Sequence, residues 1–301
     1  MTIKQLEALY WAARLGSFAL AAERLCMTQS SLSKRILELE HELNQTLFDR
    51  SGARARITNA GERVLQQAQN MLNLRDAILA DAQGNHGLAG TCRFGVSELV
   101  ASTWLASLVA ELQAIYPQVV LEPRVGVTQE MLAEVHRGET DMAIAPGGSA
   151  HSDIASCRLY EVPMIWACAP NFPFTGGVLT YEVVQQLPVV STSAQSGATA
   201  ALESWAVARG LKFKRIIACN SMGAVAALAA AGLGLCLLPK PFAQIFMERG
   251  RLRALIAEPA LQVPPLTYFL HWRKDDASVL AQSIRDVVFR VGKNLLGSEL
   301  A

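Results

Sequence analysis

Long apolar runs are absent from this 301-residue chain, and no stretch approaches the ~20 consecutive apolar residues that a membrane-spanning helix needs. The first residues, MTIKQLEALYWAARLGS, also lack the cationic head, apolar block and cleavage site of an export signal. We therefore expect no membrane segment and a cytoplasmic protein.

Clustered metal ligands and catalytic motifs are missing as well. The six cysteines contain no C-x-x-C pair, which argues against a zinc site or a disulfide framework. The five histidines show no H-E-x-x-H spacing, G-x-S-x-G is absent, and GLGL at 232–235 follows a predicted helix where a dinucleotide fingerprint requires a strand. We expect no catalytic residues, no metal, no cofactor and no enzymatic activity.

A large net charge is lacking too, because the formal total is only +1. Residues 1–58 nevertheless hold eight Lys/Arg against six Asp/Glu, whereas the remainder holds 19 against 20. Five of the eight N-terminal cations lie between residues 34 and 56. This local excess weakly favours a nucleic-acid partner for the N-terminal part, and the length predicts two or three domains.

The N-terminal segment carries the signals of three short helices. Thr2 and Gln5 form a capping-box pattern, and Gly16 is a typical helix end. Ser17 caps a second helix, and Thr28 begins a third that runs to Leu43. Two short helices joined by a tight turn predict a helix-turn-helix.

The first turns of the third helix are unusually polar. The N-terminal residues of a recognition helix enter the major groove of DNA, where Gln suits adenine, Lys or Arg suits guanine, and Ser suits either. The alternative is an ordinary solvated helix face. The candidates for contact with bases or nearby phosphates are Gln29, Ser30, Ser33, Lys34 and Arg35.

The stretch DRSGARARIT, residues 49–58, alternates cations with small residues. It predicts a short β-hairpin, or wing, whose charges hold the phosphate backbone without reading sequence; a plain surface loop is the alternative. The candidates for backbone contact are Arg50, Arg54, Arg56, Ser17, Thr28 and Thr58.

Residues 17–65 closely resemble the winged helix-turn-helix of LysR-type transcriptional regulators, a bacterial family. The motifs that carry the resemblance are Ser17, Ala21-Ala22, Thr28-Gln29, Ser33-Lys34, Leu39-Glu40, Leu47-Phe48-Asp-Arg50, and Thr58 with Gly61. The chain departs from the family pattern at Ser30 (usually Pro), Asn44 (usually Gly) and Ile57 (usually Leu). The resemblance implies a sequence-specific regulator that binds double-stranded DNA.

A long helix is predicted from Asn59 to about Gln83, followed by a glycine-rich hinge up to residue 90. Its apolar positions follow a coiled-coil-like seam, which predicts a homodimer; packing against its own domain is the alternative. The seam consists of Leu65, Ala68, Leu72, Arg75, Leu79 and Ala82. The resemblance implies a homodimer or homotetramer whose heads read an inverted repeat, and we leave RNA polymerase open as a further partner.

From residue 91 onward, strand and helix patterns alternate, which is typical of sheets covered by helices. Strands are expected at 91–97, 119–126, 141–146, 162–169, 188–192, 215–220, 234–239 and 266–273. Helices are expected at 101–115, 129–137, 197–208, 222–231 and 277–293.

The C-terminal pattern resembles the effector-binding module of the same family, which is itself similar to periplasmic binding proteins. GETDMAI (138–144) and AAAGLGLCLLP (229–239) carry this resemblance. The resulting fold class is an all-α winged helix-turn-helix with a long linker helix, followed by an α/β effector module of two subdomains. We expect a DNA-binding domain at 1–58, a linker and dimerisation helix with its hinge at 59–90, and an effector domain at 91–301. Within the last, subdomain I is 91–163 plus 268–301 and subdomain II is 164–267, with crossing strands near 162–169 and 266–272.

Ligands of open α/β sheets bind beyond the carboxyl ends of the strands. Hydroxyl residues follow several expected strands, and helix N-termini aimed at one cleft favour an anion such as a carboxylate. Simple helix capping is the alternative at each position. The candidate effector-binding residues are Ser97, Thr128, Ser193, Ser196 and Ser221.

Two further functions stay open at this stage. A solute-binding receptor could use the same C-terminal module. A thiol redox sensor could use Cys219 or Cys236, although both fall inside apolar strand patterns, where an inert buried cysteine is usual.

Overall fold

The computed structural model describes residues 1–50, 56–82, 88–174, 176–276 and 278–298. The chain forms two compact units, of which one contains Met1–Gly90 and the other most of the remainder. Among the described residues, none of the helices combines the length and the apolarity that crossing a membrane requires.

The N-terminal unit is built from α1 (Ile3–Leu15), α2 (Phe18–Arg24), α3 (Gln29–Leu43) and α4 (Asn59–Ala82). The predicted helix limits are confirmed: Thr2 and Gln5 form the capping box of α1, Gly16 ends it with φ 59°, and Asn44 ends α3 with φ 49°. A shared core of buried residues includes Leu9, Leu32 and Ile36.

A short hairpin follows α3. Strand β1 (Phe48–Asp49) pairs antiparallel with β2 (Arg56–Ile57), which confirms that the expected wing has paired strands. Its tip, with Arg54, lies outside the described residues.

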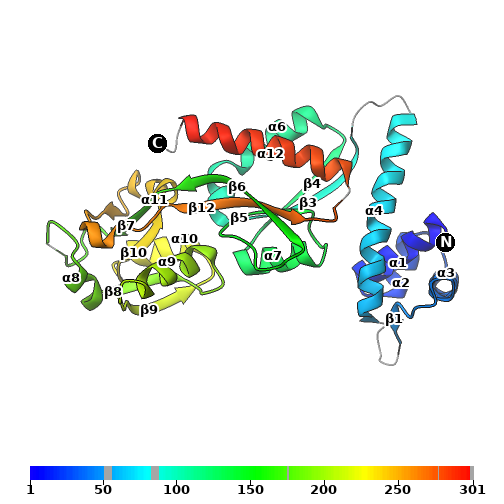
Figure 1. The fold of residues 1–301 in the computed structure, drawn as a ribbon, viewed down its shortest axis with the longest axis horizontal. Helices are drawn as coiled ribbons and strands as arrows, with labels where there is room; N and C mark the ends of the chain where they lie inside the picture. The colour runs from blue at the N-terminus through cyan, green and yellow to red at the C-terminus, as the bar shows by residue number, and fades with distance from the viewer. Residues whose placement is uncertain (51–55, 83–87, 175, 277, 299–301) are drawn as a thin grey trace. The chain divides into compact units, whose positions relative to one another are not determined.

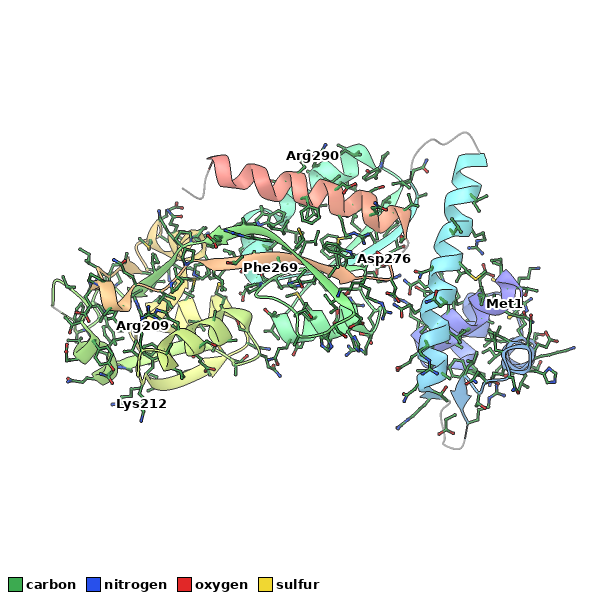
Figure 2. The ribbon with its side chains drawn as sticks, viewed as in Figure 1. Met1, Arg209, Lys212, Phe269, Asp276 and Arg290 are labelled. Atoms are coloured by element: carbon green, nitrogen blue, oxygen red, sulfur yellow. The ribbon has the colours of Figure 1, made fainter. Side chains whose placement is uncertain are left out.

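The second unit contains a five-stranded sheet in the order β4-β3-β5-β12-β6. Helices α6 and α12 lie on one face of this sheet and α7 on the other (Figure 1). Arg290 on α12, labelled in Figure 2, pairs with Glu111 on α6 at 2.7 Å. The bounds are β3 (Gly90–Val96), α5 (Glu98–Thr103), α6 (Leu105–Ile115), β4 (Val119–Val125), α7 (Thr128–His136), β5 (Met142–Pro146), β6 (Ile154–Val162), β12 (Leu266–Arg273) and α12 (Val279–Ser298).

The chain changes sheets at Pro163. Strand β7 (Met164–Cys168) is the middle strand of a three-stranded antiparallel sheet, and a parallel pair, β8 and β9, adjoins it through a bridge between Val189 and Leu235. A core that includes Trp166, Leu202 and Trp205 fills this half. The remaining bounds are α8 (Tyr181–Gln186), β8 (Pro188–Thr192), α9 (Gly197–Val207), β9 (Lys214–Cys219), α10 (Met222–Ala230), β10 (Cys236–Pro239), α11 (Lys240–Met247), β11 (Arg253–Ala254) and the 3₁₀ turn η1 (Pro259–Leu261).

The fold class is as expected, but several elements differ from the sequence prediction. The helix expected at 101–115 is two helices, because Ser97 starts α5 earlier and the backbone bends at Trp104, where φ is −130°. The strand expected at 162–169 corresponds to β7, which covers 164–168, and residue 162 belongs to the separate preceding strand β6. Elements β6, α8, α11 and β11 have no counterpart in the prediction.

The prediction that the apolar seam of α4 packs against a second copy of the chain was partly wrong. Ala68 and Leu72 are buried in the core of the N-terminal unit, with Leu65 packed against them, and Arg75 pairs with Glu7 on α1. These residues therefore pack within their own domain, which was the alternative interpretation of the pattern. The side chains of Leu79 and Ala82 are outside the described residues.

Candidate nucleic-acid interface and ligand cleft

The first turns of α3 present a polar surface. Gln29, Ser30 and Lys34 are exposed, and Lys34 keeps 79% of its side chain accessible although its Nζ lies 4.0 Å from Glu38. Ser33 and Arg35 are half-buried. The opposite face of α3 is held in the core by Leu32, Ile36 and Leu39, so the polar side chains of its first turns lie on the solvent side of the helix.

The three hydroxyls that were expected to hold a DNA backbone act as helix caps in this structure. Ser17 Oγ accepts the N–H of Leu20 at 3.4 Å, and Thr28 Oγ1 accepts the N–H of Ser31 at 3.2 Å. Thr58 Oγ1 donates to the carbonyl of Thr46 at 2.7 Å and accepts the N–H of Gly61 at 3.0 Å. Capping positions the helices, and the residues at helix starts also lie where a phosphate would approach.

Glu40 organises the base of the wing. Its Oε1 accepts the backbone N–H groups of Leu47 and Phe48 at 2.8 and 3.0 Å, and its Oε2 accepts from Arg50 at 3.0 Å. The Arg50 guanidinium also lies 5.5 Å from the Phe18 ring centroid. Arg50 is thus bound within the domain although it stays exposed, and Arg56 is exposed on β2. Sequence reasoning quoted Glu40 only as a family motif and missed this role.

Ser97 and Tyr268 meet at the carboxyl end of β3. Ser97 caps α5 by accepting the N–H of Val100 at 3.5 Å, and its Oγ donates to the Tyr268 hydroxyl at 3.3 Å. Burial raises the pKa of Tyr268 well above its usual range, although the hydrogen bond from Ser97 acts in the opposite direction. Tyr268 therefore stays a neutral phenol.

Thr128 joins the two halves of the effector module. Its Oγ1, at the start of α7, accepts the N–H of Gly197 at the start of α9, at 3.1 Å. A Cβ at Gly197 would lie 2.4 Å from the carbonyl oxygen of Pro146, so only glycine permits this approach. Ser196 is the N-cap residue of α9 but makes no side-chain cap bond.

A second contact joins the halves through Glu98, which sequence reasoning missed. The Glu98 carboxylate accepts the N–H of Met222 and, at 2.9 Å, that of Gly223, both in the first turn of α10. Ser221 donates to the same carboxylate at 3.2 Å and caps α10 by accepting from Ala224 at 3.1 Å. The chain's own carboxylate thus occupies this helix N-terminus. The only sequence signal was an acidic residue directly after Ser97.

Two cavities lie along this closed cleft. The smaller is about 30 Å³ and is lined by Ser97, Glu98, Thr128 and Ser196. The larger is about 590 Å³ and has Thr128, Ser196 and Gly197 in its wall, together with the Pro146-Gly147-Gly148 segment. The first volume is too small for an organic ligand, whereas the second is within the usual range for a small-molecule site.

The other two hydroxyl candidates stand apart. Ser221 is engaged by Glu98, and Ser193 Oγ is enclosed at the end of β8 with no hydrogen-bond partner among the described residues. Neither lines the two cavities. Arg124, on β4, lies 3.7 Å from Glu134 in an ion pair.

The two candidate cysteines, Cys219 and Cys236, give little support to thiol chemistry. Burial, together with a smaller effect of the neighbouring Cys168, raises the pKa of Cys236 to about 12. Because the thiolate is the reactive form, Cys236 is unreactive in this fold. Cys219 is half-buried, and its Sγ lies 3.4 Å from the carbonyl of Ser221.

Comparison with known proteins supplies the family. Residues 3–62 match the bacterial regulatory helix-turn-helix protein, lysR family, and residues 85–292 match the LysR substrate binding domain. The HTH-type transcriptional regulator DgdR of Burkholderia cepacia is 33% identical over 161 residues, which cover 53% of this chain and 53% of that protein. The HTH-type transcriptional regulator SoxR of Arthrobacter sp. (strain TE1826) is 26% identical over 271 residues, covering 90% and 91%.

A full-length OxyR variant from Pseudomonas aeruginosa has a similar fold. Its TM-score is 0.74 with 22% sequence identity, over 97% of this chain and 95% of that one. At this identity the likeness concerns the fold alone. The two family matches together cover the helix-turn-helix and the α/β module up to residue 292, and this chain therefore belongs to the LysR family of DNA-binding transcriptional regulators, which are not enzymes.

Proposed function

We propose that this regulator reads an inverted-repeat operator as a homo-oligomer and responds to a small anionic effector that binds in its C-terminal cleft. DNA binding and an effector-binding domain follow from the family. Our proposal adds three points: the operator is an inverted repeat, the protein is a homo-oligomer, and the effector is an anion.

On the DNA side, α3 docks in the major groove. Gln29, Ser30, Ser33 and Lys34 contact bases or nearby phosphates, with Arg35 beside them, because they form the polar first turns of the recognition helix. Arg56 and Arg54 add phosphate contacts from the wing. Ser17, Thr28 and Thr58 cap their helices and place backbone N–H groups where phosphates lie.

Oligomerisation is assigned to the other face of α4. Met71, Leu74 and Ile78 are exposed on that helix, with 41%, 57% and 59% of their surface accessible. Their spacing places them along one stripe. We assign this stripe to a second copy of the chain, in place of the seam residues that are buried in their own domain.

The anionic effector is assigned to the 590 Å³ cavity beside α9. The observation that carries this assignment is that the carboxylate of Glu98, from α5, accepts backbone N–H groups at the N-terminus of α10. One helix N-terminus of the cleft thus already binds a carboxylate. Among the described residues, the side chain that accepts from a backbone N–H at the N-terminus of α9 is the neutral Thr128 hydroxyl, which binds Gly197. A ligand carboxylate would replace that hydroxyl and gain from the helix dipole.

Binding there would alter the contact between the two halves of the module. Thr128 holds Gly197 when the cleft is closed, and an effector on the Gly197 N–H competes with it. The effector then prefers one arrangement of the halves, which is the differential affinity that any coupling requires.

Two measurements test the proposal. Selection of fragments from randomised duplex DNA should recover an inverted repeat; no enrichment at low or moderate salt, with or without effector, would contradict the proposed mode of DNA binding. Thermal shift of the full chain against small carboxylates and their matching amides should favour carboxylates. The gain should be lost in Ser196→Ala and kept or enlarged in Thr128→Val, which removes the hydroxyl that competes for the Gly197 N–H. Equal shifts with amides would refute an anionic effector and leave the DNA result intact.

A further inference from the structure

A cluster of two histidines and an aspartate lies outside the contacts that close the cleft. His136 is in the last turn of α7, and His151 and Asp153 belong to the segment that leads into β6. The three residues are 15 and two positions apart along the chain, a spacing that no short metal motif has. The fold alone brings them together.

The potential ligand atoms are close to one another. One ring nitrogen from each histidine and a carboxylate oxygen of Asp153 all lie within 4.8 Å. His136 Nδ1 is 2.8 Å from Asp153 Oδ2, and the two imidazole rings are stacked with centroids 4.5 Å apart. Both histidines are exposed and Asp153 is half-buried, so an ion from solvent can reach the cluster.

The backbone around the cluster is held independently of these side chains. Arg273 donates to the carbonyl of His136 at 2.6 Å, and the N–H of Lys274 donates to the carbonyl of Asp153 at 2.8 Å. Lys274 Nζ donates to the carbonyl of Ser152 at 2.8 Å. The end of β12 therefore fixes both segments that carry the ligands, which lowers the entropy cost of binding an ion.

The local charge also suits a cation. The last turn of α7 carries the partial negative charge of a helix C-terminus, and Asp153 adds a carboxylate. Arg273 lies 3.9 Å from Asp153, but Asp275 binds its guanidinium with two hydrogen bonds of 2.8 and 2.6 Å. The positive charge of Arg273 is therefore largely balanced by Asp275.

We propose that His136, His151 and Asp153 form a binding site for one divalent transition-metal ion of the zinc class, with water as the fourth ligand. Two imidazoles and a carboxylate are a donor set that zinc, cobalt and nickel accept. Zinc ligands sit at about 2.0–2.2 Å from the ion, and rotation of the exposed side chains closes the remaining separation. His151 also lines the 590 Å³ cavity, so the ion would stiffen one wall of the proposed effector site.

The test is metal binding to the full chain after removal of any tag and bound metal. The chain carries Cys26→Ser and Cys157→Ser, because the exposed thiols would bind zinc themselves. Calorimetric titration with zinc should give one equivalent, and cobalt should give the strong visible absorption of a four-coordinate ion. Loss of even an outer-shell partner typically weakens metal binding about tenfold or more, so His136→Gln, His151→Gln and Asp153→Asn should each weaken it by at least that factor.

The matched control is His41→Gln, which removes an exposed histidine from α3 and should leave zinc binding unchanged. Circular dichroism of each variant checks that the fold is retained. Failure of the starting protein to bind zinc or cobalt would overturn the proposal. Binding that survives in the His136→Gln/His151→Gln double variant would overturn it as well.

Discussion

The carboxylate of Glu98 accepts the backbone N–H of Gly223 at 2.9 Å and thereby joins α5 in one half of the effector module to α10 in the other. Thr128 makes a contact of the same kind with Gly197 at 3.1 Å. In both, a side-chain oxygen from the half with the five-stranded sheet meets a helix N-terminus of the other half. The cleft is therefore closed by interactions that an anionic ligand can replace.

Glu98→Gln should loosen the contact with α10. A hydrogen bond to a charged group contributes about 1.5–3 kcal/mol, and a loss near the lower end corresponds to roughly tenfold faster local opening. Hydrogen exchange of the segment that contains Met222 and Gly223 should speed up by about that factor. Glu130→Gln, on an exposed position of α7, is the control, and equal exchange in the two variants would show that Glu98 does not hold the cleft.

Gly197→Ala should open the same cleft from the other side while leaving Glu98 intact. The new Cβ would lie 2.4 Å from the carbonyl of Pro146 and 3.0 Å from Thr128 Oγ1, and the first of these atoms belongs to backbone that cannot rotate away. Exchange at Met222 and Gly223 should rise as in Glu98→Gln. Gly148→Ala is the control because its Cβ would meet open space, and exchange as slow as in the starting protein would mean that the halves adjust without separating.

The features of this fold that depend on contacts between neighbouring residues could be predicted from the sequence. Thr2, Gly16, Thr28 and Asn44 mark helix ends through contacts within a few residues, so their roles were readable from sequence. Strand β6 was missed because three consecutive residues, SCR at 156–158, are exposed at a sheet edge, where the period-two signal is weak.

Contacts made at long range were not readable in the same way. Glu98 and Gly223 are 125 positions apart in the chain, and no pattern in the sequence around Glu98 indicates that it would bind α10. The seam on α4 was readable as apolar spacing, but spacing cannot say whether Leu72 faces its own domain or another copy. His136 and His151 have no motif spacing and meet only because α7 ends beside the segment before β6.

His271 should make the effector module sensitive to acid. It is fully buried on β12, with Ser156 Oγ 2.9 Å from its Nδ1. Burial lowers the pKa of His271 to about 4 from its ordinary 6.5, although backbone contacts with Ala145 and Gly147 act in the opposite direction. The unfolded chain therefore binds a proton between these values when the folded chain does not, so stability is present above pH 6.5 and is lost as pH falls toward 4.

The full effect on the free energy of unfolding is about 3 kcal/mol. Unfolding midpoints measured at pH 7.5, 6 and 5 should fall less steeply for His271→Phe than for the starting protein, because the variant has no titrating ring. His41→Gln, on an exposed position, should keep the original slope. The same slope in His271→Phe would show that His271 is not the acid-sensitive group.

Charge placed on the exposed stripe of α4 should disrupt the oligomer. Leu74→Lys with Ile78→Lys puts two cations on positions of which 57% and 59% are accessible, and burying an unpaired charge in an apolar interface is strongly unfavourable. Sedimentation velocity should show a smaller species, with helix content unchanged. Val207→Lys, on a position 77% exposed in α9, is the matched control, and unchanged sedimentation in the double variant would move the interface elsewhere.

Gln29→Ala and Arg56→Ala should separate reading of bases from holding of phosphates. Both side chains are exposed, one at the start of α3 and the other on β2. Loss of Gln29 should remove about 1–3 kcal/mol of discrimination at one base pair of the selected operator. Loss of Arg56 should weaken binding to every sequence and reduce the slope of log affinity against log salt by about one. Arg50→Ala would mix both effects with destabilisation of the wing, because Arg50 is bound to Glu40. A changed salt slope in Gln29→Ala with intact base preference would reverse the assignment and place Gln29 on the phosphates.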